Sequence, residues 1–199
     1  MEMKRKAVFI DRDGTLNVDT AYPSRHEQIA VYPESYEAVR RLNRAGLLAV
    51  VVTNQSGVGR GLLTEDDLND IHARLSASFA SRDARLDAIY FCPHYTLSDD
   101  PRYRKECDCR KPNPGLALRA AEDLGIDLGG SYMIGDKADD IIFAMNIRAV
   151  PVLVLTGSGR DSLAKIRELG LKPAYIAETI LQAADWVLDR ERRQAHDPL

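Results

Sequence analysis

Short, fully apolar runs rich in Val and Ile recur along the chain, and amphipathic helical segments separate most of them. This alternation is typical of a parallel sheet with helices on both faces, so we predict an α/β fold with a mostly parallel central sheet. The predicted strands are Ala7–Ile10, Leu47–Val52, Ala88–Phe91, Ser131–Ile134, Val152–Leu155 and Ala174–Ile176. The predicted helices are Pro33–Ala45, Thr64–Arg82, Gly115–Leu124, Asp139–Asn146, Ser162–Leu169 and Ile180–Arg193.

Two stretches interrupt this alternation, Asn17–Tyr32 and Cys92–Asn113. Loops of this length inside a compact domain are usually functional. The chain shows no internal repeat and no low-complexity segment, so we expect a single domain over residues 1–193. The polar residues 194–199 are expected to form a frayed tail.

Composition and charge narrow the possible partners. The chain has 199 residues, a formal net charge of −3 and 45% hydrophobic residues, as expected for one soluble domain with its own core. The acidic balance leaves no broad basic surface for a nucleic acid. The longest apolar run, Ala45–Val52, is far shorter than the roughly 20 residues that span a bilayer, and no secretory signal is visible. We therefore expect a monomeric, cytoplasmic protein that binds neither nucleic acid nor membrane.

Polar residues with catalytic potential follow the predicted strands. Asp11 and Asp13 follow the first strand, Thr53 follows the second, Asp136 follows the fourth, and Lys111 precedes the third helix. Ligands of open parallel sheets bind beyond the carboxyl ends of the strands, so we predict that these five side chains share one edge of the sheet. A single such residue is commonly a loop acid or a helix cap, but five at successive strand ends favour a catalytic site.

The clustered carboxylates at this edge predict a bound cation, since they would otherwise repel one another. A few hard oxygen ligands that leave room for water and a phosphate suit Mg²⁺ better than Ca²⁺. A calcium-binding EF-hand loop that began at Asp11 would need glycine at position 16 and glutamate at position 22, where the chain has Leu16 and Tyr22. The sequence therefore predicts a catalytic Mg²⁺ site.

Magnesium beside a nucleophilic carboxylate predicts a site for phosphoryl transfer. We predict that Asp11 attacks phosphorus and forms an aspartyl phosphate. Asp13 would give a proton to the leaving alkoxide and then take one from the water that hydrolyses the intermediate. Lys111 as a cation and Thr53 as a hydrogen-bond donor would stabilise charge on the transferring group.

Four segments between Ala7 and about Leu155 together resemble the four motifs of the haloacid dehalogenase (HAD) superfamily, in order and at suitable separations. The resemblance implies a Rossmann-like three-layer fold and a Mg²⁺-dependent phosphatase whose metal shell contains Asp11, Asp136 and the backbone carbonyl of Asp13. No insertion long enough for a large cap domain follows the first or second strand. The four segments are Asp11-Arg12-Asp13-Gly14-Thr15, Thr53-Asn54, Lys111-Pro112 and Gly135-Asp136-x-x-x-Asp140.

All three cysteines and one of the four histidines fall within residues 92–109. Four ligands of this type fill a tetrahedral zinc shell and leave no position for water, so such a site would be structural. The ligand spacing is tighter than usual, and free thiols are the alternative; a Cys107–Cys109 disulfide is disfavoured in a reducing compartment. We predict a zinc-stabilised loop that leads to Arg110 and Lys111. Its ligands would be Cys92, His94, Cys107 and Cys109.

The cysteine segments resemble the subgroup of the superfamily that contains D-glycero-D-manno-heptose-1,7-bisphosphate 7-phosphatases, whose sister branch contains histidinol-phosphate phosphatases. The resemblance implies hydrolysis of the C7 phosphate of a heptose bisphosphate made for surface polysaccharide. Histidinol phosphate or another small sugar phosphate is the alternative substrate. In the heptose branch loops replace the cap in recognising substrate. The matching positions are Asp19, Thr20, Ala21, Tyr22, Thr53, Asn54, Gln55, Ser56, Arg110, Lys111 and Lys137.

Three further observations bear on function. Arg110 and Lys137 favour a substrate with a second phosphate, since Arg offers a planar fork for phosphate oxygens. The alternative of a receiver domain, a signalling domain that is phosphorylated on aspartate, is disfavoured. Such a domain would carry this aspartate after the third strand, where the chain has Cys92. The histidines outside the cysteine cluster are predicted to lie in or beside exposed segments without a catalytic role. These are His26, His72 and His196.

Overall fold

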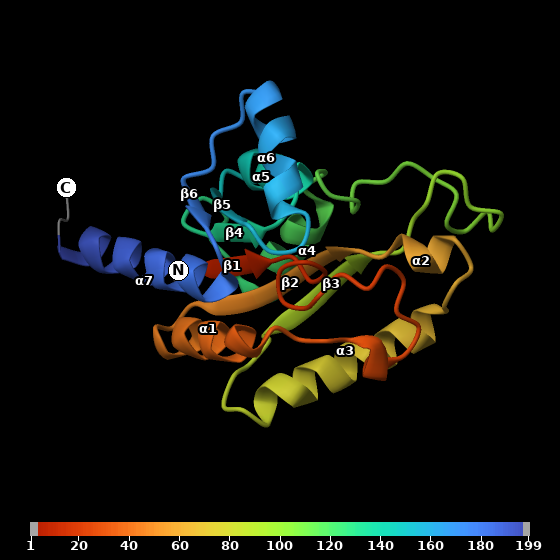
Figure 1. Cartoon of the computed structure of the whole chain (residues 1–199), viewed down its shortest axis with the longest axis horizontal. Helices are drawn as coiled ribbons and strands as arrows, with labels where there is room; N and C mark the ends of the chain where they lie inside the picture. The colour runs from red at the N-terminus through yellow and green to blue at the C-terminus, as the bar shows by residue number, and fades with distance from the viewer. Residues whose placement is uncertain (1–3, 197–199) are drawn as a thin grey trace.

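The computed structural model describes residues 4–196, in which six strands form one sheet in the order β3-β2-β1-β4-β5-β6 (Figure 1). Every neighbouring pair is parallel. The predicted parallel sheet is confirmed, and the predicted strand ends are correct to within two residues. The strands are β1 (Ala7–Ile10), β2 (Leu48–Asn54), β3 (Ala88–Cys92), β4 (Tyr132–Gly135), β5 (Val150–Val154) and β6 (Tyr175–Ala177).

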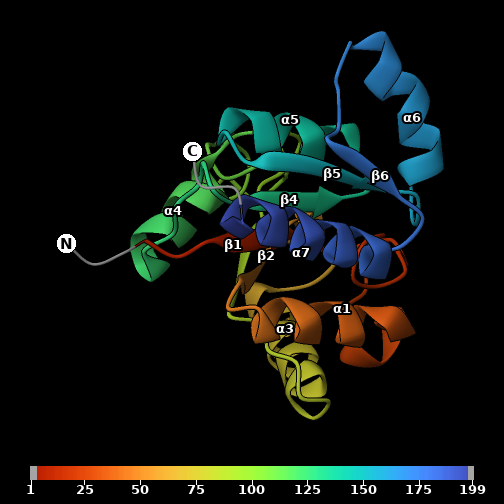
Figure 2. The same ribbon diagram turned by 90° about the vertical axis from the view of Figure 1, so that its left-hand side faces the viewer.

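Helices cover both faces of the sheet and give the expected three layers (Figures 1 and 2). One face carries α1 (Pro33–Arg44), α3 (Glu65–Ala80) and α7 (Ile180–His196). The other face carries α4 (Gly115–Leu124), α5 (Ala138–Asn146) and α6 (Gly159–Glu168). Two short helical turns, α2 (Ser56–Gly59) and η1 (His26–Gln28), lie in the connections. Helix α7 passes the predicted boundary at Arg193, and the last three residues of the predicted tail lie outside the described residues.

The alternation of side chains along β1 divides the core into two parts. Val8 and Ile10 pack toward α1 and α7, whereas Ala7 and Phe9 pack toward α4 and α5. All four are fully buried. Because both faces of the sheet are covered, the strands are apolar along most of their length rather than at every second position.

The direction of the sheet order reverses at β1, which lies between β2 and β4. In such sheets a crevice opens beyond the carboxyl ends of the two strands at the reversal. Ile10 pairs with Ile134 across this point, so the segments that follow β1 and β4 leave the sheet side by side. The order is that of a Rossmann-like fold, as expected, and it selects this crevice as the place for a site.

The two predicted long loops also begin at this edge of the sheet. Residues 11–32 follow β1 and fold back through a bridge between Asn17 and Val31. Residues 93–114 follow β3 and contain neither helix nor strand. Within the described residues, neither the connection after β1 nor the one after β2 holds a cap domain, and no helix is long and apolar enough to cross a membrane.

Candidate active site

The predicted nucleophile Asp11 forms a buried ion pair with Lys111. The Lys111 Nζ lies 2.8 Å from Asp11 Oδ1 and 2.6 Å from Asp140 Oδ1, and all three side chains are buried. Burial by itself would lower the pKa of Lys111, but the two carboxylates raise it above its ordinary value. Lys111 is therefore a fixed cation beside the oxygen atoms that would attack phosphorus.

Three buried carboxylates meet at the crevice, because Asp11, Asp136 and Asp140 place oxygen atoms within 4.8 Å of one another. Burial and the nearby charge of Asp11 raise the pKa of Asp136 to about 7. Burial raises the pKa of Asp140 to about 6, against the opposing effect of Lys111. Asp136 Oδ1 is buried without a hydrogen-bond partner. A hard divalent cation would relieve this repulsion and satisfy that oxygen, so the residues fit Mg²⁺.

The structure adds one carboxylate to the predicted metal-binding group. The Asp13 side chain lies outside the three-carboxylate cluster, and Asp140, which the metal prediction left out, lies within it. The backbone carbonyl of Asp13 as a metal ligand stays a prediction. Asp140 sits in the first turn of α5, where its carboxylate also accepts a hydrogen bond from the Lys137 backbone.

Two glycines of the motifs make room for the carboxylates. A Cβ atom at Gly135 would lie 2.3 Å from the Asp140 carboxyl group, and one at Gly14 would lie 2.3 Å from Asp136 Oδ2. Gly14 also has a backbone φ of +87°, which residues other than glycine rarely adopt. The cluster of Asp11, Asp136 and Asp140 therefore depends on glycine at both positions.

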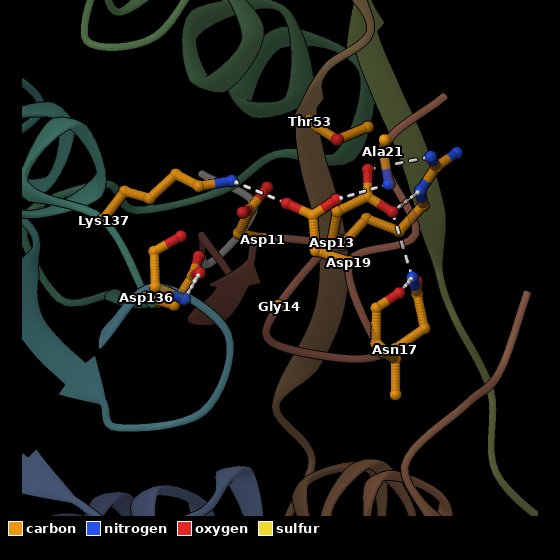
Figure 3. A network of polar contacts seen from close by, with 12 residues as sticks. Asp11, Asp13, Gly14, Asn17, Asp19, Ala21, Thr53, Asp136 and Lys137 are labelled. Carbon is orange, nitrogen blue, oxygen red and sulfur yellow. Dashed lines mark hydrogen bonds and ion pairs between the residues drawn. The ribbon is translucent and has the colours of Figure 1, made fainter. Parts of the chain in front are cut away.

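The Asp13 carboxylate is held by four hydrogen bonds. Arg12 Nε and Asn17 Nδ2 donate to Oδ1 at 3.1 and 3.0 Å, while Arg12 Nη2 and Gln55 Nε2 donate to Oδ2, each at 2.8 Å. Figure 3 shows Asn17 beside Asp13. Burial raises the pKa of Asp13, but the charge of Arg12 and these hydrogen bonds together hold it below its ordinary value. The predicted acid and base is therefore ionised and fixed in orientation.

Sequence reasoning missed three residues of this network, namely Arg12, Asn17 and His72. Arg12 is fully buried, and its Nη1 lies 3.0 Å from His72 Nε2 on α3. The predicted exposure of His72 is wrong, since the residue is only 6% exposed. A signal for its burial was present, because His72 shares one helical stripe with apolar residues. These are Leu68, Ile71, Leu75 and Phe79.

A hollow of about 50 Å³ opens over the carboxylates and lysines. One water molecule needs roughly 10–15 Å³, so the hollow has room for a phosphoryl group. Thr53 Oγ1 accepts a hydrogen bond from Gln55 at 2.9 Å, which leaves the hydroxyl proton available to a ligand. The hollow is lined by Asp11, Asp13, Thr53, Asn54, Lys111, Lys137, Asp139 and Asp140.

The predicted substrate loop at residues 19–22 lies beside this hollow. Lys137 Nζ reaches to 3.5 Å from Asp19 Oδ2, and Asp19 Oδ1 accepts a hydrogen bond from the Ala21 backbone (Figure 3). Burial alone would lower the pKa of Lys137, but the carboxylates of Asp11 and Asp136 raise it. Thr20 donates to the Gln28 carbonyl, and the exposed Tyr22 ring faces the Arg60 guanidinium.

Other predicted substrate residues contact protein groups. Asn54 binds the backbone of Lys111, and Gln55 binds Asp13 and Arg12. Arg110 and Ser56 do not line the hollow, and Arg110 Nη1 donates to the His94 carbonyl at 3.4 Å. A direct contact of these residues with substrate stays a prediction.

The predicted zinc ligands Cys92, His94, Cys107 and Cys109 form a second cluster. Their sulfur atoms lie 3.1 to 3.5 Å apart, and His94 Nδ1 lies 3.2 Å from Cys109 Sγ. A tetrahedral zinc with Zn–S bonds of about 2.3 Å would place sulfur atoms about 3.8 Å apart, close to this arrangement. All three cysteines are free thiols. The donor set fits a structural zinc ion that would tie the loop to the end of β3.

A larger pocket of about 970 Å³ lies between the start of α3 and the loop that follows β3. It contains none of the predicted site residues. The predicted catalytic residues therefore gather at the small hollow on the sheet edge.

Comparison with known proteins agrees with this geometry. A profile of the HAD-hydrolase-like family matches residues 108–183. The chain is 42% identical over 178 residues to D-glycero-beta-D-manno-heptose-1,7-bisphosphate 7-phosphatase of Pasteurella multocida, covering 88% of this chain and 93% of the relative. The Escherichia coli K12 protein of the same name is 40% identical over 184 residues, covering 92% and 88%.

Solved structures show the same relationship. The D,D-heptose 1,7-bisphosphate phosphatase of B. bronchiseptica, complexed with magnesium and phosphate, matches with a TM-score of 0.81 and 35% identity over 93% of this chain and 99% of that one. The corresponding phosphatase of Burkholderia thailandensis matches with a TM-score of 0.67 and 31% identity over 92% and 99%. The chain therefore belongs to the HAD superfamily and, within it, to the family of D-glycero-D-manno-heptose-1,7-bisphosphate 7-phosphatases.

Proposed function

We propose that this chain is a cytoplasmic, Mg²⁺-dependent phosphatase that removes the C7 phosphate from D-glycero-D-manno-heptose 1,7-bisphosphate, through an aspartyl phosphate, for the synthesis of surface polysaccharide. The observation that carries the proposal is the buried contact of Asp11 with Lys111 beside Asp136 and Asp140. The names of relatives at 40% identity and above support the choice of substrate.

Asp11 is the nucleophile. Its carboxylate oxygen forms a bond to phosphorus while the bond from phosphorus to the C7 oxygen breaks. Lys111 stabilises the charge on the transferring group, and Thr53 donates a hydrogen bond to one of its oxygens. Mg²⁺, held by Asp11, Asp136 and the Asp13 carbonyl, would supply further positive charge to the phosphoryl oxygens.

Asp13 moves the protons of both half-reactions. A bound phosphate dianion adds negative charge nearby and raises the proton affinity of the Asp13 carboxylate, which then takes up one proton from the surrounding water. Asp13 then gives its proton to the departing C7 alkoxide, and the resulting carboxylate takes a proton from the water that attacks the acyl phosphate. The four hydrogen bonds to its oxygens support this assignment, because they hold the group in one orientation beside the hollow.

Residues around the hollow would recognise the rest of the substrate. Lys137 and the loop of residues 19–22 flank its mouth, where sugar hydroxyls would lie. Arg110 and Lys137 are the groups we assign to the second, unreacting phosphate. The zinc cluster would act at a distance, by ordering the loop that carries Arg110 and Lys111.

A phosphate-release assay tests the proposal. Its substrates are both anomers of the heptose bisphosphate, histidinol phosphate and fructose 1,6-bisphosphate, each with Mg²⁺. We expect the highest kcat/KM for the β anomer, the substrate for which the relatives are named. A chelator too weak to strip zinc should abolish turnover, and added Mg²⁺ should restore it. A higher kcat/KM for histidinol phosphate would contradict the assigned substrate.

A further inference from the structure

A fully buried guanidinium lies next to the predicted acid and base. Arg12 has no exposed surface, and its Nε and Nη2 form a fork on the two oxygens of Asp13. The Nη2 also donates to Gln55 Oε1 at 2.9 Å. Its Nη1 points away from Asp13 and meets His72 Nε2 on α3 at 3.0 Å. Removing a partner from a buried charged donor is costly, so each of these contacts restrains the guanidinium.

The contact fixes the chemical state of His72. An arginine guanidinium can only donate, so His72 Nε2 must accept and the ring proton must lie on Nδ1. Burial, and next the charge of Arg12, lower the pKa of His72 to about 3, which agrees with a neutral ring. The ring also packs against Phe91 on β3, with centroids 5.6 Å apart. His72 is thus a neutral acceptor that is itself held by its surroundings.

We propose that His72 is a positioning residue for proton transfer by Asp13: it fixes the plane of the Arg12 guanidinium, which in turn fixes the plane of the Asp13 carboxylate. The inference rests on the proposed function, which assigns proton transfer to Asp13. With His72 replaced by an apolar side chain, Arg12 Nη1 would lose its acceptor, and the fork would rotate to find another. Small displacements of a reacting group reduce rates strongly.

The choice of leaving group separates this role from general support of the fold. Departure of the C7 alkoxide needs the proton of Asp13, whereas departure of p-nitrophenolate from p-nitrophenyl phosphate does not, because that anion is weakly basic. The value of kcat/KM reports the steps up to departure of the leaving group and excludes later hydrolysis of the intermediate. A displaced Asp13 should therefore lower kcat/KM for the heptose bisphosphate selectively.

The experiment measures kcat/KM for both substrates in the full chain with saturating Mg²⁺. For His72→Leu we expect a loss of about tenfold with the heptose bisphosphate, a part of the roughly 10²–10⁴-fold that acid and base catalysis contributes, and a change below about twofold with p-nitrophenyl phosphate. His72→Gln, whose Oε1 can accept from Arg12, should restore most of the loss. Leu75→Ala removes core packing on the same helix and should leave the ratio of the two values unchanged.

The possible results are distinguishable. An unchanged ratio in folded His72→Leu, or an equal loss with both substrates, would overturn the positioning role. If His72→Leu does not fold, His72→Asn removes the same contact with a shorter polar side chain, and an unchanged ratio there overturns the role as well. If the wild-type chain hydrolysed neither of the two substrates, that result would instead refute the proposed function.

Discussion

The side-chain amide of Asn54 pairs with the backbone of Lys111 through two hydrogen bonds. Nδ2 donates to the Lys111 carbonyl at 3.0 Å, and the Lys111 N–H donates to Oδ1 at 2.9 Å. Asn54 is the last residue of β2, whereas Lys111 lies in a loop without helix or strand. The pair thus replaces the backbone contacts of a sheet and holds Lys111, the proposed catalytic lysine, against Asp11.

Asn54→Ala should therefore disturb the position of Lys111 without changing that residue. We expect kcat to fall by about tenfold or more, since Lys111 would lose its backbone anchor, and the free energy of unfolding to fall by about 1–3 kcal/mol for two lost hydrogen bonds. Steady-state kinetics and urea unfolding measure both effects. Asn43→Ala is the matched control, because Asn43 accepts a backbone hydrogen bond from Arg85 away from the site. An equal loss of kcat in both variants would contradict the anchoring role.

Asp11→Asn should abolish turnover while the fold stays intact. The amide keeps the volume of the side chain but is no nucleophile. The change also removes one of the three negative charges that Asp11, Asp136 and Asp140 bring together. We expect a loss in kcat of more than about a thousandfold. Circular dichroism and thermal unfolding serve as controls for the fold. Retention of one tenth of wild-type activity at saturating Mg²⁺ would be incompatible with an aspartyl-phosphate mechanism.

The cysteine and histidine cluster should hold one zinc ion per chain. Elemental analysis of protein purified without chelator measures this number, and a value near zero with freely alkylated thiols would exclude the site. Cys107→Ser should leave the core folded but lower activity, because the loop of residues 93–114 would no longer hold Arg110 and Lys111 in place. Hydrogen exchange should show lost protection in this loop and unchanged protection in the central strands. Full activity with a protected loop would make zinc dispensable.

The buried His72 should make stability depend on pH. Its pKa is about 3 in the folded chain and about 6.5 when unfolded, so between these values only the unfolded state binds the proton. The resulting stability is fully present above pH 6.5 and is lost as the pH falls toward 3. Between pH 7 and pH 5 the wild type should lose about 2 kcal/mol more unfolding free energy than His72→Gln. Urea titrations at both pH values test this, and equal losses would show that His72 is not held neutral.

The sequence was sufficient to predict the layers and the edge of the sheet at which the candidate site residues gather. Short apolar runs that are rich in Val and Ile and show no alternation favour strands buried on both faces, and the reversal of a parallel sheet places Asp11 beside Asp136. The strand ends were harder to predict. Thr53 and Asn54 follow the apolar run of β2, yet both pair with β3 and belong to the strand. Backbone pairing thus continues where hydrophobicity has stopped.

Contacts between distant polar residues could not be predicted from one sequence. The Asn54 amide resembles a substrate ligand in the motif, and only the fold shows that Lys111 occupies both of its polar atoms. Arg12 lies between two motif aspartates with nothing local to indicate that it is buried. His72 was the exception, since helical periodicity placed it among core residues and could have revealed its burial.

The central place of β1 has a consequence for the order in which the chain is synthesised. β1 precedes the other described strands along the chain, but one of its two neighbours in the sheet, β4, begins only at Tyr132. Until then one edge of β1 has no partner strand, and Asp11 has neither Asp136 nor Asp140 beside it. A nascent chain that stops before β4 thus carries Asp11, the proposed nucleophile, without the neighbouring carboxylates, and it exposes an open strand edge to other chains. Catalytic competence and protection of the central strand arise together, with the second half of the sheet.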